Sequence, residues 1–225
     1  MELKTKQLKG MTLALLMLIS AMAGCLGADD DTDESESTAD EKPAFLDASD
    51  AGYTYASNVD NHRSLMQDLC DIKTAASENN WDEAKNIYQN GKNAQKDDGS
   101  YRTLAGFAGA EGKKHNYDSF YNESGAIGAH IMDAMEGTGD FAGVSDTVRY
   151  QGIAKLTANM GMVGYTIHEL NAALAKAGDN NLDNDSGAPH NWDEAWAFFH
   201  GPDEHYGCSP AKVMEKRAGD FNTAD

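Results

Sequence analysis

The clearest pattern in the chain is a stripe of apolar residues that recurs every three or four positions. It consists of Ile153, Leu156, Met160, Val163, Ile167, Leu170 and Leu174. Only a helix places such a series on one face. Ser145 and Asp146 precede the stripe as a capping signal, and Gly178 follows Lys176 as a stop signal. The pattern therefore predicts one long helix between residues 145 and 178.

Two further segments have helical spacing. Residues 57–76 place on one face the side chains of Val59, His62, Met66, Leu69 and Ile72. Residues 117–135 do the same with Phe120, Ile127, Ile131 and Ala134. No segment alternates between apolar and polar residues with the period of two that is typical of a strand. The expected fold class is therefore all-α, a helical bundle with connections rich in Gly and Asp.

The N-terminus has the order of a secretory signal. Lys4, Lys6 and Lys9 precede an apolar run over residues 11–24, which is shorter than the about 20 residues of a membrane-spanning helix. The run ends in Met-Ala-Gly before Cys25, which is the pattern of a lipobox. We interpret residues 1–24 as a lipoprotein signal peptide and Cys25 as the lipidated residue, which two acyl chains would anchor to a membrane. The alternative is an ordinary signal cut near Ala23.

An acidic segment follows the proposed lipidation site. Residues 28–41 contain eight acids and no aliphatic side chain larger than Ala, so they cannot form a core. We interpret residues 25–44 as a disordered tether and residues 45–225 as one helical domain. The whole chain has a net charge of −19, and removal of the signal would make it −21. Nucleic acid is therefore excluded as a partner.

Two cysteines, Cys70 and Cys208, remain besides Cys25. In an exported chain an even pair of cysteines predicts a disulfide. In the chain-entropy view, closing so long a loop would stabilise the fold by about 4 to 5 kcal/mol.

A five-residue string occurs twice. Asn-Trp-Asp-Glu-Ala occupies residues 80–84 and again residues 191–195, and each copy is followed by a glycine, Gly91 or Gly201. The repetition suggests duplication of a helical unit. Each copy has the composition of a helix start, with Asn as the cap and acids in the first turn. That structural role is the alternative to a ligand role for Glu83, Asp193 and Glu194.

Seven histidines in so acidic a chain suggest a metal site, because imidazole and carboxylate together suit iron, zinc or manganese. His130 and Asp133 are three residues apart on an inward-facing helix side, as in di-metal helical bundles. His168 lies on a row of small residues, Gly164, Ala172 and Ala175, and Glu169 is adjacent but turned by about 100°. His62 shares a face with apolar residues and is interpreted as a core residue. Packing is the alternative role for each of these histidines.

The C-terminal part of the chain resembles a known family. The segment His190-Asn-Trp-Asp-Glu-Ala-Trp-Ala-Phe-Phe-His-Gly201, followed by Tyr206-Gly-Cys-Ser-Pro210 and Lys216-Arg-Ala-Gly-Asp-Phe221, resembles the low-iron-inducible, iron-assimilation proteins that algae secrete. The resemblance implies an extracytoplasmic, iron-linked binding protein. It also implies that the acids and histidines in and around Trp-Asp-Glu-Ala contact iron.

A second likeness concerns Gly128 to Asp133, which is similar to the Gly-x-His-x-x-Glu motif of imelysin-type periplasmic proteins, with Asp in place of Glu. The members of these families are longer, and residues 221–225 contain no helix stop, which is consistent with a C-terminal truncation of the domain.

The leading hypothesis from the sequence is a lipid-anchored, extracytoplasmic iron-binding protein that assists iron uptake together with a membrane transporter. No catalytic motif for nucleophilic, zinc-peptidase or nucleotide chemistry is present, so we do not expect an enzyme. The expected metal ligands are His130, Asp133, His168, Glu169, Glu83, Asp193 and Glu194. The alternatives are an imelysin-like protein and a helical-repeat lipoprotein that binds proteins without a metal.

Overall fold

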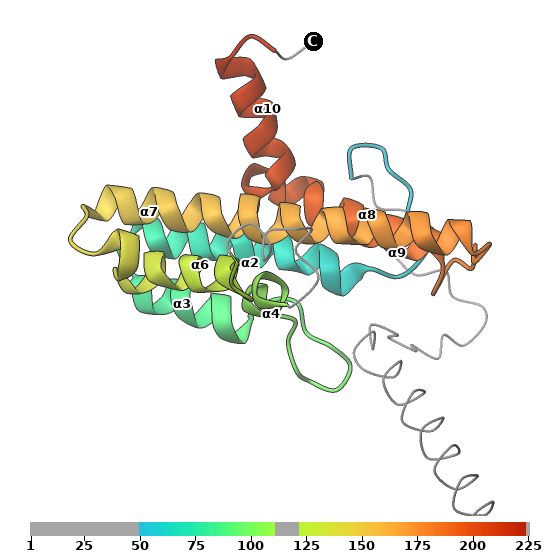
Figure 1. Ribbon diagram of the computed structural model, residues 1–225, viewed down its shortest axis with the longest axis horizontal. Helices are drawn as coiled ribbons and strands as arrows, with labels where there is room; N and C mark the ends of the chain where they lie inside the picture. Colours follow the sequence, from blue (N-terminus) through green and yellow to red (C-terminus); the bar gives the residue numbers. More distant parts are fainter. Residues whose placement is uncertain (1–49, 111–121, 224–225) are drawn as a thin grey trace, which may run out of the picture. The chain divides into compact units, whose positions relative to one another are not determined.

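The computed structural model describes residues 50–110 and 122–223, which all belong to one compact unit (Figure 1). The expected signal peptide, the tether, Cys25 and Phe120 lie outside the described residues. The expected all-α fold is confirmed: the described part contains eight α-helices and no strands. They are α2 (Asp60–Ser77), α3 (Trp81–Asn90), α4 (Leu104–Gly109), α6 (Ala126–Glu136), α7 (Asp146–Lys155), α8 (Val163–Gly178), α9 (Ala188–Phe199) and α10 (Pro210–Asp220).

Helix α2 lies at the centre of the packing, in contact with α3, α7 and α9. Its predicted apolar face is confirmed, because every member of that face is buried: Val59, His62, Met66, Leu69 and Ile72. Helix α6 likewise buries Ile127, Ile131 and Ala134, as expected. Within the ranges that the structure describes, no helix is long and apolar enough to cross a membrane.

The predicted long helix is present, with a change of helix type in its middle. α7 begins at Asp146 and α8 ends at Gly178, as the capping and stop signals indicated. Between them, η3 (Leu156–Met162) is a π-helical segment, so that α7 and α8 form one continuous helical run (Figure 1). At its two ends, the hydroxyls of Thr157 and Thr166 donate to the carbonyls four residues earlier, at 2.8 and 2.9 Å.

The π-helical segment changes which residues face the core. Beyond Ile153, the buried residues are Thr157, Ala158, Gly161, Met162, Gly164, Tyr165, Thr166, Glu169 and Ala173. A π-helix closes its hydrogen bonds one residue later than an α-helix, so the residues after it are rotated about the helix axis relative to a straight helix. Leu156 and Met160 of the predicted stripe are partly buried and pack against the core, but its last member, Leu174, is 68% exposed. Beyond Ile153 the predicted stripe is therefore not the most buried face of the helix. Glu169, which the straight helix would have turned away, points inward.

The two copies of the repeated string have different roles. In the first, Asn80 caps α3 as predicted, because its side chain accepts a hydrogen bond from the Glu83 backbone N–H at 3.3 Å. The second copy is not a helix start. α9 begins earlier, at Ala188 with Pro189 in its first turn, so Asn191 is already inside the helix. The predicted cap at Asn191 was wrong for that reason.

Both copies nevertheless end alike. Gly91 and Gly201 follow their helices with φ of 71° and 66°, in the left-handed region that favours glycine. The space at both positions is also tight. A Cβ on Gly91 would lie 2.6 Å from the Arg102 carbonyl oxygen, and one on Gly201 would lie 2.8 Å from Met66 Cγ.

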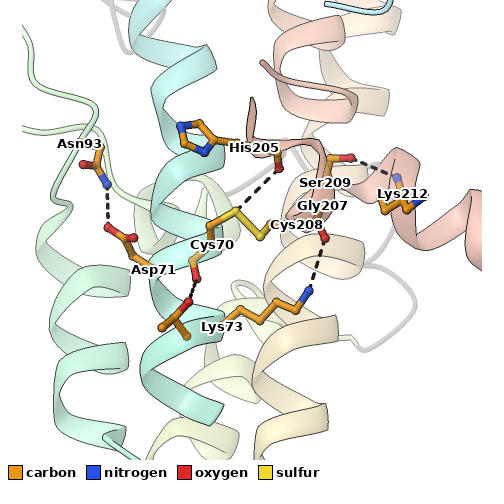
Figure 2. The surroundings of a disulfide bond; sticks show 10 residues. Cys70, Asp71, Lys73, Asn93, His205, Gly207, Cys208, Ser209 and Lys212 are labelled. Carbon is orange, nitrogen blue, oxygen red and sulfur yellow. Dashed lines mark hydrogen bonds between the residues drawn. A yellow bond between two sulfur atoms is a disulfide. The ribbon is translucent and has the colours of Figure 1, made fainter. Parts of the chain in front are cut away.

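The predicted disulfide between Cys70 and Cys208 is present, with a Cα–Cα distance of 5.3 Å and a sequence separation of 138 residues. It joins α2 to η4 (Asp203–Cys208), the short helix that follows α9. Figure 2 shows that Lys73, one turn beyond Cys70 on α2, also reaches this helix through the Gly207 carbonyl, at 3.3 Å. The segment between α9 and α10 is thereby attached to the central helix.

Candidate metal centre

A cluster of polar side chains is buried where α2, α8 and α9 meet. α8 and α9 lie side by side along their length (Figure 1), and both α8 and α9 carry acids into the interface. The cluster consists of His62 from α2, Glu169 from α8, and His190, Asn191 and Glu194 from α9. All are buried except His190, whose side chain is 12% exposed at the edge.

Glu194 is the centre of the cluster. Its Oε1 lies 3.4 Å from His62 Nε2 and 3.2 Å from His190 Nε2. His190 and Glu194 are four residues apart on α9, so the helix itself brings them to one side. His62 comes from the opposite element, where its ring packs edge-on against Phe198 at 5.2 Å. Two imidazole nitrogens from different helices therefore meet the same carboxylate oxygen.

Asn191 connects this group to the second acid. Its side-chain nitrogen donates to Glu169 Oε2 at 2.6 Å and to Glu194 Oε2 at 3.3 Å. The inward turn of α8 after the π-helical segment makes this contact possible. The amide holds two carboxylates near each other in an interior from which water is largely excluded, and that arrangement is costly unless a cation compensates.

Several polar atoms of the cluster are buried without an aligned hydrogen bond. They are Glu194 Oε1, His190 Nε2 and Asn191 Oδ1. The Glu194 and His190 atoms are close enough to attract each other but are not in hydrogen-bonding geometry. Buried polar atoms are normally satisfied, so unsatisfied ones concentrated at one place call for an explanation such as an ion or a water.

The pKa values of Glu194 and His190 are shifted in the directions that favour an ion pair between them. Burial by itself raises the pKa of Glu194, but the charge of His62 and the contact with His190 outweigh it and lower the pKa to about 2. Burial lowers the pKa of His190, but the close contact with Glu194 and the charge of Glu194 outweigh this, and the net change is upward. Glu194 is therefore a carboxylate at neutral pH, and it favours a cation beside it.

The donor types of the cluster are those of a metal site, although its geometry is not that of a metal-bound state. Two imidazoles and a carboxylate are the ligand set of many non-haem Fe(II) sites, and a second carboxylate is at hand. Ligands about 2.0 to 2.2 Å from one ion lie about 3 to 3.5 Å apart, as the Glu194–histidine distances do. Within residues 50–110 and 122–223, however, no three His, Cys, Asp or Glu side chains form a ready-made metal site. A metal would require side chains of the cluster to rotate.

Of the expected ligands, the structure brings Glu169 and Glu194 together. Asp193 is fully buried but points the other way. It accepts hydrogen bonds from the Tyr53 hydroxyl, the Ala56 N–H and both the N–H and the hydroxyl of Ser57, at 2.6 to 2.9 Å. Its carboxylate thus attaches the segment before α2 to α9.

The other expected ligands lie elsewhere. On α6, His130 packs against Phe141 at 5.6 Å, and Asp133 accepts a hydrogen bond from the Thr138 hydroxyl at 2.8 Å in the turn after the helix. Glu83 is half-buried in the first turn of α3. His168 precedes Glu169 on α8 and packs against Tyr165 at 5.3 Å. None of these contacts joins the residue concerned to Glu194.

Sequence reasoning treated His62 as a core residue and left His190 out of the list of expected ligands. The family resemblance pointed to the histidines around Trp-Asp-Glu-Ala in general, and the spacing of His190 and Glu194, four residues apart in a helix, pointed to a contact between these two. His62 lies on an apolar face, as expected of a core residue, and its second role depends on which helix packs against that face.

The described residues thus form an all-α protein with a buried cluster of histidines and acids. The chain belongs to the family of low iron-inducible periplasmic proteins, whose pattern matches residues 38–217. The match contains every residue of the cluster, and it confirms the expected iron-linked, extracytoplasmic family. Comparison with curated proteins and with solved structures gave no match in either case.

The Glu194–His190 contact predicts a pH dependence of stability. Glu194 has a lowered pKa, so its stabilising contribution is complete above the ordinary value of 4.5 and is lost as the pH falls towards about 2. His190 has a raised pKa, so its contribution is complete below 6.5 and is lost as the pH rises through the higher, folded-state value. We expect the difference in unfolding free energy between wild type and Glu194→Gln to be largest between pH 4.5 and 6.5.

Urea denaturation of both proteins from pH 2 to pH 9, in the presence of a chelator, measures this difference. The chelator removes any contribution from bound metal. A difference that stays constant over the whole range would contradict the ion pair.

The two repeats supply a matched test of the role of Asp193. Replacement of Asp193 by Ala leaves four buried or half-buried donors without their acceptor, so we expect the free energy of unfolding to fall by about 3 kcal/mol or more. The equivalent Asp82→Ala, at an exposed position in the first turn of α3, should cost less than about 1 kcal/mol. Chemical denaturation checks both values, and equal losses would show that the buried acceptor is unimportant.

Proposed function

We propose that this protein binds iron outside the cytoplasm at the cluster of His62, Glu169, His190 and Glu194, and that it assists iron assimilation. The observation that carries the proposal is the meeting of two imidazole nitrogens at one buried carboxylate oxygen, at 3.2 and 3.4 Å, from helices distant in sequence. The family, low iron-inducible and periplasmic, supplies the biological context. No chemical reaction is part of the proposal.

The ion would replace the protons that the cluster holds without it. A divalent iron between the imidazoles and Glu194 would compensate the two carboxylates that Asn191 now brings together. His190, at the partly exposed edge, is the side chain best placed to rotate and admit the ion. Because the imidazoles must be neutral to bind, affinity should fall when the pH drops below the raised pKa of His190.

Anaerobic titration with Fe²⁺, followed by calorimetry, tests the site. We expect one ion per chain in the wild type and an affinity at least about tenfold lower in Glu194→Gln, because the substitution removes the charged ligand. The matched control is Glu83→Gln, the same replacement in the first repeat, which should bind as the wild type does.

Near-ultraviolet circular dichroism shows whether each variant is folded. His190→Asn, at the edge of the cluster, is a second variant that disturbs the core less. Absence of stoichiometric binding in the wild type would overturn the function. Binding that persists unchanged in both Glu194→Gln and His190→Asn would place the iron elsewhere, and a purely structural role for the cluster would follow.

We further propose that Cys25 is lipidated and anchors the mature chain to the outer face of a membrane, from which a transporter could receive the metal. The support is the basic start, the short apolar run and the lipobox that precede this cysteine. Two acyl chains suffice for stable attachment.

Fractionation of expressing cells tests the anchor. We expect the wild type in the membrane fraction and Cys25→Ser in the soluble fraction, because the acyl chains have no other point of attachment. Cys70→Ser is the matched control and should remain with the membrane, because Cys70 is part of the disulfide. A wild type that is soluble, or a Cys25→Ser variant that stays with the membrane, would contradict lipidation.

A further inference from the structure

A second polar site lies on another part of the domain, beside the disulfide. A pocket of about 240 Å³ opens between α2, α7, η4 and α10. Its lining includes the side chains of Lys73, Lys155, Lys212, Lys216 and Arg217. Cys208 forms part of its wall, and Figure 2 shows Lys73 of α2 reaching the neighbouring Gly207 carbonyl.

The composition of the lining is unusual for this chain. The protein has 37 acidic and only 18 basic residues, yet five of the basic residues line this pocket and no acid does. In a chain with a net charge of −19, five cations and no acid around one pocket form a local concentration of positive charge. Such a gathering raises the local concentration of anions and favours their binding.

Among the described residues, two of the five cations form salt bridges, and Lys73 donates to the Gly207 carbonyl. Lys212 contacts Glu215 at 2.9 Å and Arg217 contacts Asp220 at 2.8 Å, both within α10 and largely exposed. Over the part of the chain that the structure describes, Lys155 and Lys216 form no ion pair with a carboxylate. The positive charge of the pocket is therefore only partly neutralised by the protein.

The neighbouring charges repel one another. Burial lowers the pKa of Lys155, and the charges of Arg217, Lys216 and Lys73 lower it further. These charges come from α2, α7 and α10, which the Cys70–Cys208 bond and the Lys73 contact with Gly207 hold near one another. The fold thus maintains a repulsive arrangement that an anion would relieve.

We propose that this pocket binds a small polyvalent oxyanion of the phosphate or polycarboxylate kind. Its volume is below the about 300 to 1,000 Å³ of sites for drug-sized ligands, so it suits a compact ion. Lysine ammonium groups on flexible stems bind several oxygens of such an ion as point charges. The site uses none of the side chains of the iron cluster, so it does not depend on the iron proposal.

Calorimetric titration of the metal-free protein with inorganic phosphate and, separately, with citrate tests the site. We expect saturable binding of at least one of the two at one ion per chain, weakened by added sodium chloride. The double variant Lys155→Gln/Lys216→Gln should bind at least tenfold more weakly. The matched control is Lys85→Gln/Lys96→Gln, which removes the same charge outside the pocket and should bind as the wild type does.

Melting temperatures separate lost binding from lost folding. Without anion, Lys155→Gln/Lys216→Gln should melt no lower than the wild type, because the substitutions relieve repulsion. With anion, the wild type should gain more than the variant does.

Titration with vesicles that carry anionic headgroups tests whether the oxyanion belongs to a lipid rather than to a free ion. Failure of the wild type to bind either free ion would overturn the proposal, and so would binding to vesicles alone. Equal weakening in the pocket variant and in its control would also overturn it, because net charge rather than the pocket would then be responsible.

Discussion

The burial of two consecutive acidic residues on α9 is the constraint on which the arrangement of this domain depends. Asp193 and Glu194 are neighbours in sequence, so they point in different directions, and both are almost completely removed from water. A buried carboxylate needs donors or positive charge around it. Asp193 finds them in the segment before α2, and Glu194 finds them in the histidines of α2 and α9. α9 is thereby tied to the start of the described chain and to its central helix at once.

Much of the fold was predictable because it rests on local signals. The apolar spacing of α2, the capping signals at Ser145 and Gly178, and the even number of cysteines besides Cys25 each depend on a few neighbouring residues or on simple counting. The failures come from features outside the hydrophobic pattern and the repeated string. The π-helical segment leaves little trace in a hydrophobic pattern, since Leu156, Met160 and Val163 fit a straight helix equally well. The second repeat begins its helix early because Pro189 precedes the string.

The candidate site was predictable only in part. Glu169 and Glu194 were among the expected ligands, on the basis of a helix row and of a family resemblance. Glu169 was expected as a ligand on the assumption of a straight helix. In the structure, its inward position instead results from the π-helical segment before it. The helical spacing predicts a core position for His62. Its contact with Glu194 arises from the packing of α9 against α2. Conversely, His130 and Asp133 have the spacing of ligands, but their contacts are with Phe141 and Thr138.

The geometry of the cluster depends on how α8 is rotated about its own axis, and the π-helical segment sets that rotation. η3 contributes the extra position by which the face of α8 advances, and Glu169 lies seven residues after its end. Loss of a single residue within Leu156–Met162 would rotate everything after it by about 100°. Every donor of the cluster would still be present in the sequence, but Glu169 would no longer face Asn191. In relatives of this protein, the length of this segment is therefore as informative about the site as the identity of the side chains.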